Sequence, residues 1–530
     1  MIKNITSKLF RLKDLNSILA ESHDPEHRLK KALGPVELIL FGIGVIIGAG
    51  IFATVGTAAA GDALRPGAGP ALTLSFAITG VACGFAALCY AELASLVPIS
   101  GSAYTYSYAS FGELIAWIIG WDLILEYCVG CIAVSISWSG YFVGLLHSLG
   151  VNLPSWMTFD FRSAMHGFYK ASELLRNGVA FSNIPPALQN TFEAVQTAPH
   201  IMGFPIIFNL PASAIVLFLA ALLVRGIKES SRFNMVIVVV KLLVLGFFVV
   251  LGAHFFKPEN WKPFAPNGFA GIKAGAAIVF FAFIGFDCVS TVAEETRNPR
   301  RDMPIGIIGS LVICTIIYVL VAAVFTGMIP LHALQSALGH EKAEPLALAF
   351  RYVNLPWAGI IVAFGSIVAQ LAVLLVLQMG QARIFFSMAR DGLLPDIFAR
   401  VHKKFKTPHV TTIVTGFVIA AVAALTNIEE MVDLTNVGTL FAFCLVCFGV
   451  IILRVKEPHK PRTFKVPFSP VVPLLGVSSC AFLMTALPAV TWIRFVAWLI
   501  VGLIVFFSYS FRHSLLHKEP HLHHPHPHQS

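Results

Sequence analysis

Long runs of apolar residues, separated by short polar connections, dominate the chain from residue 36 to residue 511. Each run has about 18 or more residues with few charges, which is the length an α-helix needs to cross the hydrocarbon core of a membrane. The pattern therefore predicts an all-α integral membrane protein with twelve spans. We place these spans at 36–60, 71–97, 112–146, 206–225, 234–255, 273–293, 304–328, 357–388, 410–426, 438–454, 470–489 and 492–511.

Polar segments divide the chain into further units. We expect a cytoplasmic N-terminal segment at 1–34, a helical core at 35–455 with halves at 35–255 and 273–455, two added helices at 470–511, and a His-rich cytoplasmic tail at 512–530. The connection at 147–205 is the longest and lies on the predicted external side. Its length favours a folded cap or short helices over a plain linker.

Composition and charge support the membrane interpretation. Hydrophobic residues make up 57% of the chain and charged residues only 12%, whereas a soluble domain carries about 25% charged residues. The net charge is +9, but Lys and Arg gather in the N-terminal segment, in alternate loops and in the tail. This asymmetry predicts that both termini lie in the cytoplasm. We expect the spans to cross an inner or plasma membrane. It also argues against nucleic-acid binding, since no basic face is interleaved with exposed aromatic residues.

The cysteines and histidines do not indicate a disulfide framework, a metal site or a cofactor. All nine cysteines fall inside predicted spans, and the two CxxC pairs are more typical of helix packing than of redox chemistry. The seven histidines of the tail alternate with prolines, and this composition favours a disordered tail over a metal site. We find no HExxH, GxSxG or P-loop motif, so we do not expect an enzyme.

Two spans are interrupted by glycine at corresponding places. The first contains the sequence GIGVIIGAGIF at 42–52, and the sixth contains FFAFIGFDC at 280–288. Glycine-interrupted spans at matching positions in two halves indicate an inverted-repeat transporter with broken helices. The alternative is that these glycines only allow close helix packing.

A break in the first span would create a site for a zwitterion near the middle of the membrane. Unwinding near Gly48, Ala49 and Gly50 exposes backbone N–H groups that bind a carboxylate at a helix N-terminus. The opposite broken end, at Ile46 and in span six near 281–284, exposes carbonyls that bind an ammonium group. Two aromatic side chains would cover this site, unless they are simply part of the core: Phe281 and Phe283.

Lys241 lies in the apolar run IVVVKLLVL. An ionisable residue inside the membrane is costly and indicates function by default. Burial favours loss of the proton from a lysine, so Lys241 is a candidate for proton coupling. The alternative is snorkelling of the side chain toward the membrane surface.

Four carboxylates are predicted in or near spans: Glu92, Asp122, Glu126 and Asp287. Asp122 and Glu126 are four residues apart and share a helix face. That face is suited to a cationic substrate side chain or to proton movement, and equally to a structural ion pair. Asp287 follows the glycine of span six and is a candidate anchor for the break.

Several longer motifs resemble the amino acid–polyamine–organocation (APC) superfamily, and within it a bacterial member of the cationic amino acid transporter family. They are GIGVIIGAGIF at 42–52, ALCYAEL at 87–93, GSAYTYSY at 101–108, FDCVSTVAEETRNPRRDMPIGI at 286–307 and ARIFFSMARDGLLP at 382–395. The resemblance covers residues 30–510 and implies a LeuT-type five-plus-five inverted repeat with broken helices 1 and 6, plus two C-terminal helices.

The resemblance also implies roles for particular residues. By position, Gly48–Gly50 match the carboxylate-binding break and Ile46 an ammonium contact, while Phe281 and Ile284 match residues that cover and touch the substrate. Glu126 resembles a position facing the substrate side chain. Lys241 corresponds to the lysine of proton-coupled members, whose ammonium occupies the space that sodium fills in sodium-driven relatives.

Together these observations predict a proton-coupled importer of amino acids that works by alternating access. The substrate is cationic, such as arginine, or small and neutral, such as alanine. The alternatives are an exchanger or facilitator without proton coupling and a transporter-like nutrient sensor. A passive channel or a membrane enzyme fits less well. The sequence does not decide whether a small accessory subunit binds, because lipid-facing and partner-facing apolar surfaces look alike in sequence.

Overall fold

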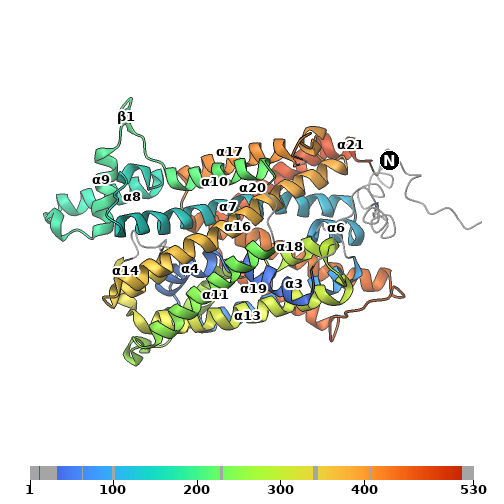
Figure 1. Ribbon diagram of the computed structural model, residues 1–530, viewed down its shortest axis with the longest axis horizontal. Helices are drawn as coiled ribbons and strands as arrows, with labels where there is room; N and C mark the ends of the chain where they lie inside the picture. The colour runs from blue at the N-terminus through green and yellow to red at the C-terminus, as the bar shows by residue number, and fades with distance from the viewer. Residues whose placement is uncertain are drawn as a thin grey trace, which may run out of the picture.

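The chain was analysed as a computed structural model, which describes residues 11, 33–62, 64–97, 102–226, 231–337, 344–405 and 407–515. Almost all of the predicted N-terminal segment, and the tail from residue 516, lie outside the described residues. Long helices run side by side along the longest axis of the molecule (Figure 1). The fold is a bundle of apolar helices, and the long connection between α7 and α10 lies outside it.

Eight helical stretches of the described residues are long and apolar enough to cross a membrane. Four of them are single helices: α7 (Glu113–Ser148), α13 (Pro299–Met328), α16 (Pro356–Arg390) and α18 (Ile428–Lys456). A fifth is the part Met235–Ala253 of α11 (Ser231–Ala253). The other three combine several elements: Gly69–Leu96 contains η1 (Gly69–Ala71) and α5 (Leu72–Leu96), Gly268–Glu295 contains α12 (Gly268–Val279), η5 (Phe280–Phe283) and η6 (Asp287–Glu295), and Ala489–His513 contains α20 (Ala489–Val505), η9 (Phe506–Ser510) and α21 (Phe511–His513).

Four more apolar helices or helix pairs accompany these eight. The helices α3 (Pro35–Ile46) and α4 (Ala49–Ala60) form one pair bent by 46°, which counts as a ninth span if the pair is taken together. Three helices are shorter: α10 (Leu210–Val224), α17 (His409–Leu425) and α19 (Val471–Met484). Each of these stretches overlaps one of the predicted spans.

The helix α18 begins earlier than the sequence predicted. Its first turn is acidic, whereas the predicted span starts only at residue 438. Two contacts make these charges compatible with a helix. The side chain of Asn427 caps the helix by accepting from the backbone N–H of Glu430 at 3.0 Å. Arg65 neutralises Asp433 one turn further on, with 2.8 Å between guanidinium and carboxylate.

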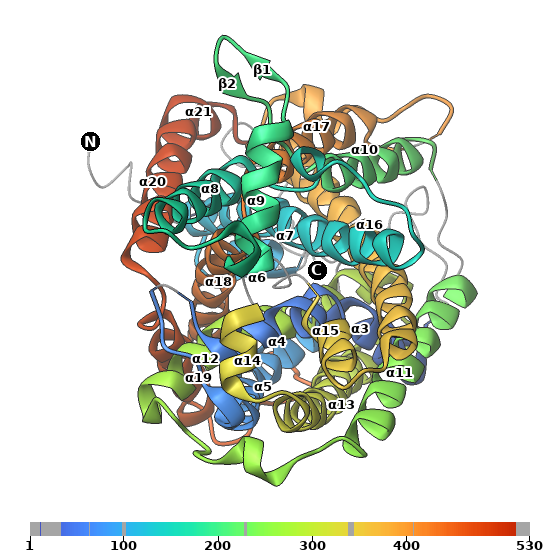
Figure 2. The same ribbon diagram turned by 90° about the vertical axis from the view of Figure 1, so that its left-hand side faces the viewer.

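The connection between α7 and α10 folds into a cap at one end of the bundle (Figures 1 and 2). The cap consists of η2 (Ser155–Met157), α8 (Phe161–Arg176), η3 (Phe181–Asn183), α9 (Pro186–Thr197) and the antiparallel hairpin of β1 (His200–Ile201) and β2 (Phe204–Pro205). It has a small core of its own, formed by Ala164, Val195, Ala198 and Ile207. We call this end of the molecule the cap end and the opposite one the tail end.

Short helices connect the spans elsewhere. They are α6 (Ser102–Ser110), η4 (Pro258–Trp261), α14 (Leu331–Ala337), α15 (Pro345–Tyr352) and η8 (Asp396–Ala399). The centre of the bundle is α7, which packs against α16 and α18, while α13 packs against both α3 and α5. One continuous hydrophobic core joins all of these helices.

The last helical stretch is attached to α7 by a pair of tryptophans. The indole rings of Trp121 and Trp498 stack with their centroids 4.6 Å apart. Each indole N–H donates to the backbone carbonyl of the other residue, at 2.9 and 3.1 Å. Both buried donors are therefore satisfied within one contact.

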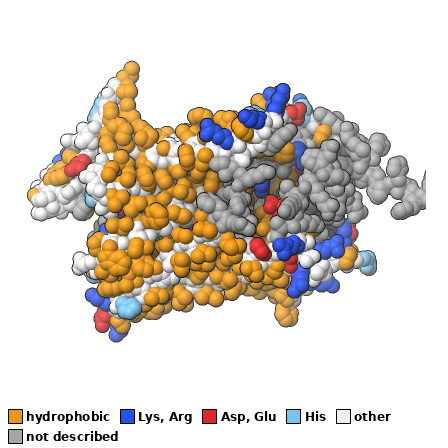
Figure 3. Space-filling view, in the orientation of Figure 1, with side chains coloured by type: hydrophobic (Ala, Val, Ile, Leu, Met, Phe, Trp, Pro, Cys, Tyr) orange, Lys and Arg blue, Asp and Glu red, His pale blue; other side chains and the backbone are white. Residues whose placement is uncertain are grey.

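Hydrophobic side chains cover the flanks of the bundle, and charged side chains gather at its two ends (Figure 3). The side chains of Leu243, Phe417 and Ile504 are examples, each more than 60% exposed in the absence of lipid. An apolar band of this kind on a bundle of long helices is the surface that contacts lipid. The fold is thus that of a multi-span membrane protein.

Candidate functional site

The first span is broken between Ile46 and Ala49. The backbone leaves the helical conformation at Ile47 (ψ 98°) and Gly48 (φ −149°, ψ −146°), and a new helix starts at Ala49. The first amides of any helix have no partner within it, so the N-terminus of α4 directs free N–H groups into the break. The predicted break is therefore present in the structure, with Gly48 in it and Ala49 and Gly50 in the first turn of α4.

Lys241 of α11 holds the carbonyl side of this break. Its Nζ donates to the carbonyl of Gly44 at 2.5 Å and to that of Ile47 at 3.0 Å, and the side chain is fully buried. The side chain thus points into the bundle at the break and does not reach for the membrane surface. The snorkelling alternative is wrong.

Tyr318 of α13 joins the first break to the second. Its hydroxyl lies 2.9 Å from the carbonyl oxygens of both Ile46 and Ala282. The carbonyl of Ile46, expected to receive an ammonium group, therefore already accepts from a protein donor and keeps one further lone pair. Sequence reasoning missed Tyr318, because a single tyrosine in an apolar run gives no periodic or motif signal.

The sixth span is broken around Ile284 and Gly285. The α-helix α12 ends at Val279, tighter turns follow as η5, and Ile284 is extended (ψ 134°). Gly285 then has φ +118°, a conformation that only glycine adopts readily. The carboxylate of Asp287 accepts from the N–H of Gly285 at 3.3 Å, so the predicted anchor does lie at the break.

The two breaks lie directly against each other. A Cβ added at Gly50 would overlap the backbone of Ala282, and one added at Gly285 would approach Val45 at 2.8 Å. On the other side, a Cβ at Gly48 would come within 2.9 Å of Val373 on α16. The glycines therefore serve close packing as well as the breaks, and the inverted repeat stays a prediction.

The two phenylalanines of η5 lie in different surroundings. Phe281 keeps 7% of its surface exposed. Phe283 is fully buried, with its ring centroid 6.1 Å from that of Phe76 and 5.3 Å from that of Tyr318. The position of Phe283 in this aromatic cluster is that of a core residue, whereas Phe281 borders the break.

Comparison with known proteins decides the family. The family model described as amino acid permease matches residues 33–509, which is most of the chain. The chain belongs to the amino acid permease family. The predicted membership of the APC superfamily is thereby confirmed.

Relatives of the permease are named for different substrates. The branched-chain amino acid permease BcaP of Bacillus subtilis is 44% identical over 96% of this chain and 99% of its own length. The methylthioribose transporter of the same species is 42% identical over 97% of this chain and 100% of its own. The vacuolar cationic amino acid transporter 4 of Arabidopsis thaliana is 36% identical over 85% of this chain and 68% of its own. All are permeases or transporters, which confirms that the chain is not an enzyme.

A group of polar side chains lies in the core of the permease beside the breaks. Glu126 of α7 is 5% exposed, and Asp122 lies one turn before it on the same helix. The neighbouring Tyr127 contacts Cys288 of η6, with 3.4 Å between hydroxyl and thiol. This part of α7 therefore meets the segment that follows the second break.

Asp122 has different surroundings from Glu126. It is fully buried beside Gly438 of α18, and neither carboxylate oxygen has a hydrogen-bond partner within the described part of the chain. A buried carboxylate without partners is strongly disfavoured in its charged form. The structure therefore does not place Asp122 in a structural ion pair.

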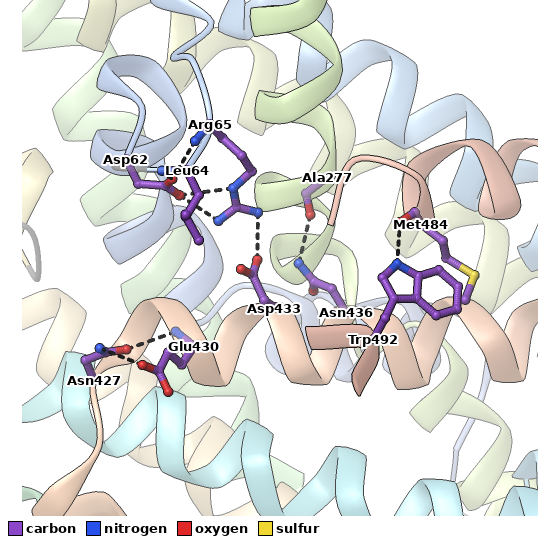
Figure 4. A network of polar contacts seen from close by, with 10 residues as sticks. All are labelled: Asp62, Leu64, Arg65, Ala277, Asn427, Glu430, Asp433, Asn436, Met484 and Trp492. Carbon is purple, nitrogen blue, oxygen red and sulfur yellow. Dashed lines mark hydrogen bonds and ion pairs between the residues drawn. The ribbon is translucent and has the colours of Figure 1, made fainter. Parts of the chain in front are cut away.

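Ion pairs tie α18 to the bundle at both ends. At the cap end, Arg65 contacts Asp62 at 2.7 Å and Asp433 at 2.8 Å (Figure 4). At the tail end, Glu92 contacts Arg454 at 2.5 Å. The pair of Arg65 and Asp433 joins α18 to the segment that follows α4. The pair of Glu92 and Arg454 joins α18 to α5. Glu92, left open by the sequence, thus has a structural partner.

No group of three or more metal-ligating side chains occurs among the residues that the structure describes. The nine cysteines are all free thiols, seven of them buried and two partly buried. The site is built from backbone amides, backbone carbonyls, one lysine, one tyrosine and buried carboxylates. Amides and carbonyls can form hydrogen bonds with a polar organic solute, and the lysine and carboxylates can carry protons.

Proposed function

We propose that this permease imports amino acids together with a proton, by alternating access between two sides of the membrane. The observation that carries the proposal is the contact of Lys241 with the carbonyls of Gly44 and Ile47, directly beside the break of the first span. An ionisable group that donates to two carbonyls of a broken helix makes the shape of that helix depend on its proton.

The break offers two opposite polarities to a zwitterion. The N-terminus of α4, at Gly48, Ala49 and Gly50, presents amides and the positive end of the helix dipole to a carboxylate. The carbonyls near Ile46 and in the span-six segment at 281–284 would receive the ammonium group. Phe281 and Ile284 would lie against the bound substrate, with Phe283 supporting them from the core.

Protonation of Lys241 would control how the first span is held. With its proton, the ammonium donates to both carbonyls and fixes the break against α11. A neutral amine keeps fewer donors and no charge, so these contacts weaken and the two halves of the span gain freedom to move. Binding of substrate and proton would then be coupled through the same few backbone atoms.

The side chain of the substrate would face Glu126. A carboxylate at this place favours a cationic group on the substrate. Arginine as a substrate is also consistent with the cationic amino acid transporters among the relatives. The relatives that carry branched-chain amino acids and methylthioribose are more similar in sequence, so we include leucine and methylthioribose with arginine and alanine as test solutes.

We further propose the LeuT-type arrangement of twelve spans, with five-plus-five inverted repeats and two added helices. The cap end would face the outside of the plasma membrane, and both termini would lie in the cytoplasm. The division of the chain at 34, 455 and 512 follows from this arrangement. Support comes from the two breaks, which meet in the core from helices at corresponding places in the two halves.

Uptake into proteoliposomes tests the function. Labelled arginine, alanine, leucine and methylthioribose are each offered with and without an inward proton gradient, in sodium-free buffer. We expect one amino acid to accumulate only with the gradient. Uptake that needs internal substrate and ignores the gradient would indicate an exchanger, and saturable binding without flux would indicate a sensor.

The role of Glu126 is tested in the same vesicles. The Glu126→Gln variant keeps the shape of the side chain and removes its charge. If the carboxylate recognises the substrate side chain, uptake of arginine falls more than uptake of alanine or leucine. Equal losses for all solutes would show that Glu126 acts only on structure or on the proton.

A further inference from the structure

The β1–β2 hairpin of the cap extends beyond the side of the helix bundle. In Figure 2, which looks along the bundle, the hairpin reaches past the outline formed by α10 and α17. In Figure 1 it stands out sideways from the end of α10. The hairpin therefore does not cover another part of the described chain. It overhangs the space that lipid occupies next to the bundle.

The tip of this hairpin is apolar and exposed. Ile201, Met202 and Phe204 are 61%, 95% and 73% exposed. The segment 198–209 that contains them has no Lys, Arg, Asp or Glu. Three adjacent large apolar side chains, without a charge to keep them in water, mark an interaction surface.

The turn of the hairpin is unusual for one that faces water. Met202 and Gly203 both have positive φ, at 51° and 82°, which is the geometry of a tight two-residue hairpin turn. Such turns favour Asn or Asp before Gly, because bulky residues are strained in this conformation. A methionine there is both strained and almost fully exposed. The cost of exposure is lower if its side chain enters an apolar phase, and this gain offsets the backbone strain.

The base of the hairpin is held firmly at the level where the lipid-facing helices begin. The N–H of Asn209, just before α10, donates to the carbonyl of Ala424 on α17 at 2.9 Å. The Asn209 side chain in turn accepts from Ser139 of α7 at 2.7 Å. The N–H of Phe208 donates to the carbonyl of Trp156 at 3.1 Å. The hairpin is thus fixed to three parts of the fold and does not hang from a loose loop.

The apolar surface of the hairpin continues into the lipid-facing band. Figure 3 shows hydrophobic side chains from the tip of the hairpin down to the flank of the bundle, with no Lys, Arg, Asp or Glu on the hairpin itself. On this flank α10 exposes Leu210 and Phe218, and α17 exposes Leu425.

We propose that the hairpin at 200–205 is a membrane-interface anchor, with Ile201, Met202 and Phe204 inserted at the boundary of headgroups and acyl chains in the leaflet on the cap side. Apolar side chains on a rigid element bind at this depth without spanning the membrane. The anchor would hold α8 and α9 at a fixed height above the bilayer. This inference rests on the membrane position of the helices and is independent of the substrate and of the coupling ion.

Spin labels on three single cysteines test the position of the hairpin. The native cysteines are buried or partly buried, and the unsubstituted protein, treated in parallel, supplies the background. The test position is Met202→Cys. The reference for lipid is Phe218→Cys on α10, and the reference for water is Asn177→Cys at the end of α8, an exposed residue. Each protein is reconstituted into nanodiscs of phosphatidylcholine and phosphatidylglycerol.

Collision rates of the label are measured with oxygen, which concentrates in hydrocarbon, and with a water-soluble nickel chelate. We expect the oxygen-to-nickel ratio at Met202→Cys to exceed that at Asn177→Cys severalfold and to approach that at Phe218→Cys. A ratio equal to that at Asn177→Cys would place the hairpin in water and overturn the proposal. Low rates with both reagents would place it against protein, such as a second copy, and would overturn the proposal as well.

A second substitution shows whether the apolar side chains cause the contact. Phe204→Asp, added to Met202→Cys, is expected to lower the ratio toward the water reference, whereas Phe204→Leu is expected to keep it. Solute uptake by both double variants verifies that the bundle is folded. If Phe204→Asp leaves the ratio unchanged in a transporting protein, the side chains of the tip do not anchor the hairpin and the proposal is wrong.

Discussion

The two helix breaks touch each other in the core but are held in different ways. At the first break, the carbonyls of Gly44, Ile46 and Ile47 accept from side chains of two other helices, Lys241 of α11 and Tyr318 of α13. At the second break, Tyr318 contacts the carbonyl of Ala282, but the contact at the bend itself is local and involves no ionisable group of another helix: the carboxylate of Asp287 accepts from an N–H two residues earlier.

Under the proposed proton coupling, this difference predicts which break would respond to protons. A segment held by a distant ionisable group changes when that group titrates, whereas a segment held by its own next residues keeps its shape. We therefore expect the first break to be the mobile, proton-sensitive one. The second would be a preformed surface against which it moves. Tyr318 links them, since its hydroxyl also contacts the carbonyl of Ala282.

The strongest test of this comparison is Lys241→Ala. The substitution leaves two buried carbonyls without their donor, at a cost of about 1–3 kcal/mol each, and it removes the titrating group. We expect gradient-driven uptake to fall to background, a loss of roughly 100-fold if both costs act on transport. The control is Lys170→Ala on the exposed face of α8. Gradient-driven uptake that survives in Lys241→Ala would disprove the assignment of the first break as proton-sensitive.

The next largest effect is expected for Gly50→Ala. The added methyl group would overlap the backbone of Ala282 and force the two breaks apart. Overpacking of this kind costs about 1–3 kcal/mol, so uptake should fall by about tenfold or more. Gly84→Ala on α5 is the matched control, because a Cβ there meets nothing within 4 Å. Similar uptake by both variants would mean that the breaks do not need to be in contact.

Tyr318→Phe should have an intermediate effect. Loss of the hydroxyl leaves the carbonyls of Ile46 and Ala282 without this donor, at about 1–3 kcal/mol for an unsatisfied buried group. We expect a higher KM for uptake, by about fivefold to tenfold, with gradient dependence retained because Lys241 is intact. Tyr169→Phe, on the exposed side of the cap, serves as the control. A normal KM would show that the two breaks keep their relative position without this link.

The smallest effect is expected for Asp287→Asn. The amide oxygen still accepts from the N–H of Gly285, so only the charge is lost, and the net cost is about 0.5–1.5 kcal/mol or less. Initial rates at several external pH values should therefore stay close to those of the unsubstituted protein. A loss as large as that of Lys241→Ala would mean that the second break also depends on charge, and the contrast between the breaks would fail.

The sequence predicted the parts of this site that leave a local signal. The glycines mark the breaks for two reasons: Gly285 has a positive φ, and Gly42, Gly48 and Gly50 have neighbours too close for a larger side chain. Lys241 is conspicuous because a charge in an apolar run is rare. The order and approximate position of the helices follow from hydrophobicity alone.

Other features arise only from tertiary contacts and leave no such signal. The role of Tyr318 depends on two carbonyls far away in the sequence. The sequence of the first turn of α18 resembles that of a loop. Its helical structure depends on Arg65, also distant in sequence, which neutralises Asp433. The burial of Asp122 without a partner depends on the approach of Gly438. Spacing along one helix therefore does not distinguish Asp122 from Glu126.

The stacked pair of Trp121 and Trp498 gives the permease an internal optical reporter. Indoles at 4.6 Å that also exchange hydrogen bonds share one rigid geometry, so their coupled near-ultraviolet circular dichroism depends on α20 staying in place beside α7. Trp498→Phe would remove this signal and leave the rest of the aromatic spectrum largely intact. The difference spectrum would follow detachment of the C-terminal helix during heating, separately from the unfolding of the bundle that contains the two breaks.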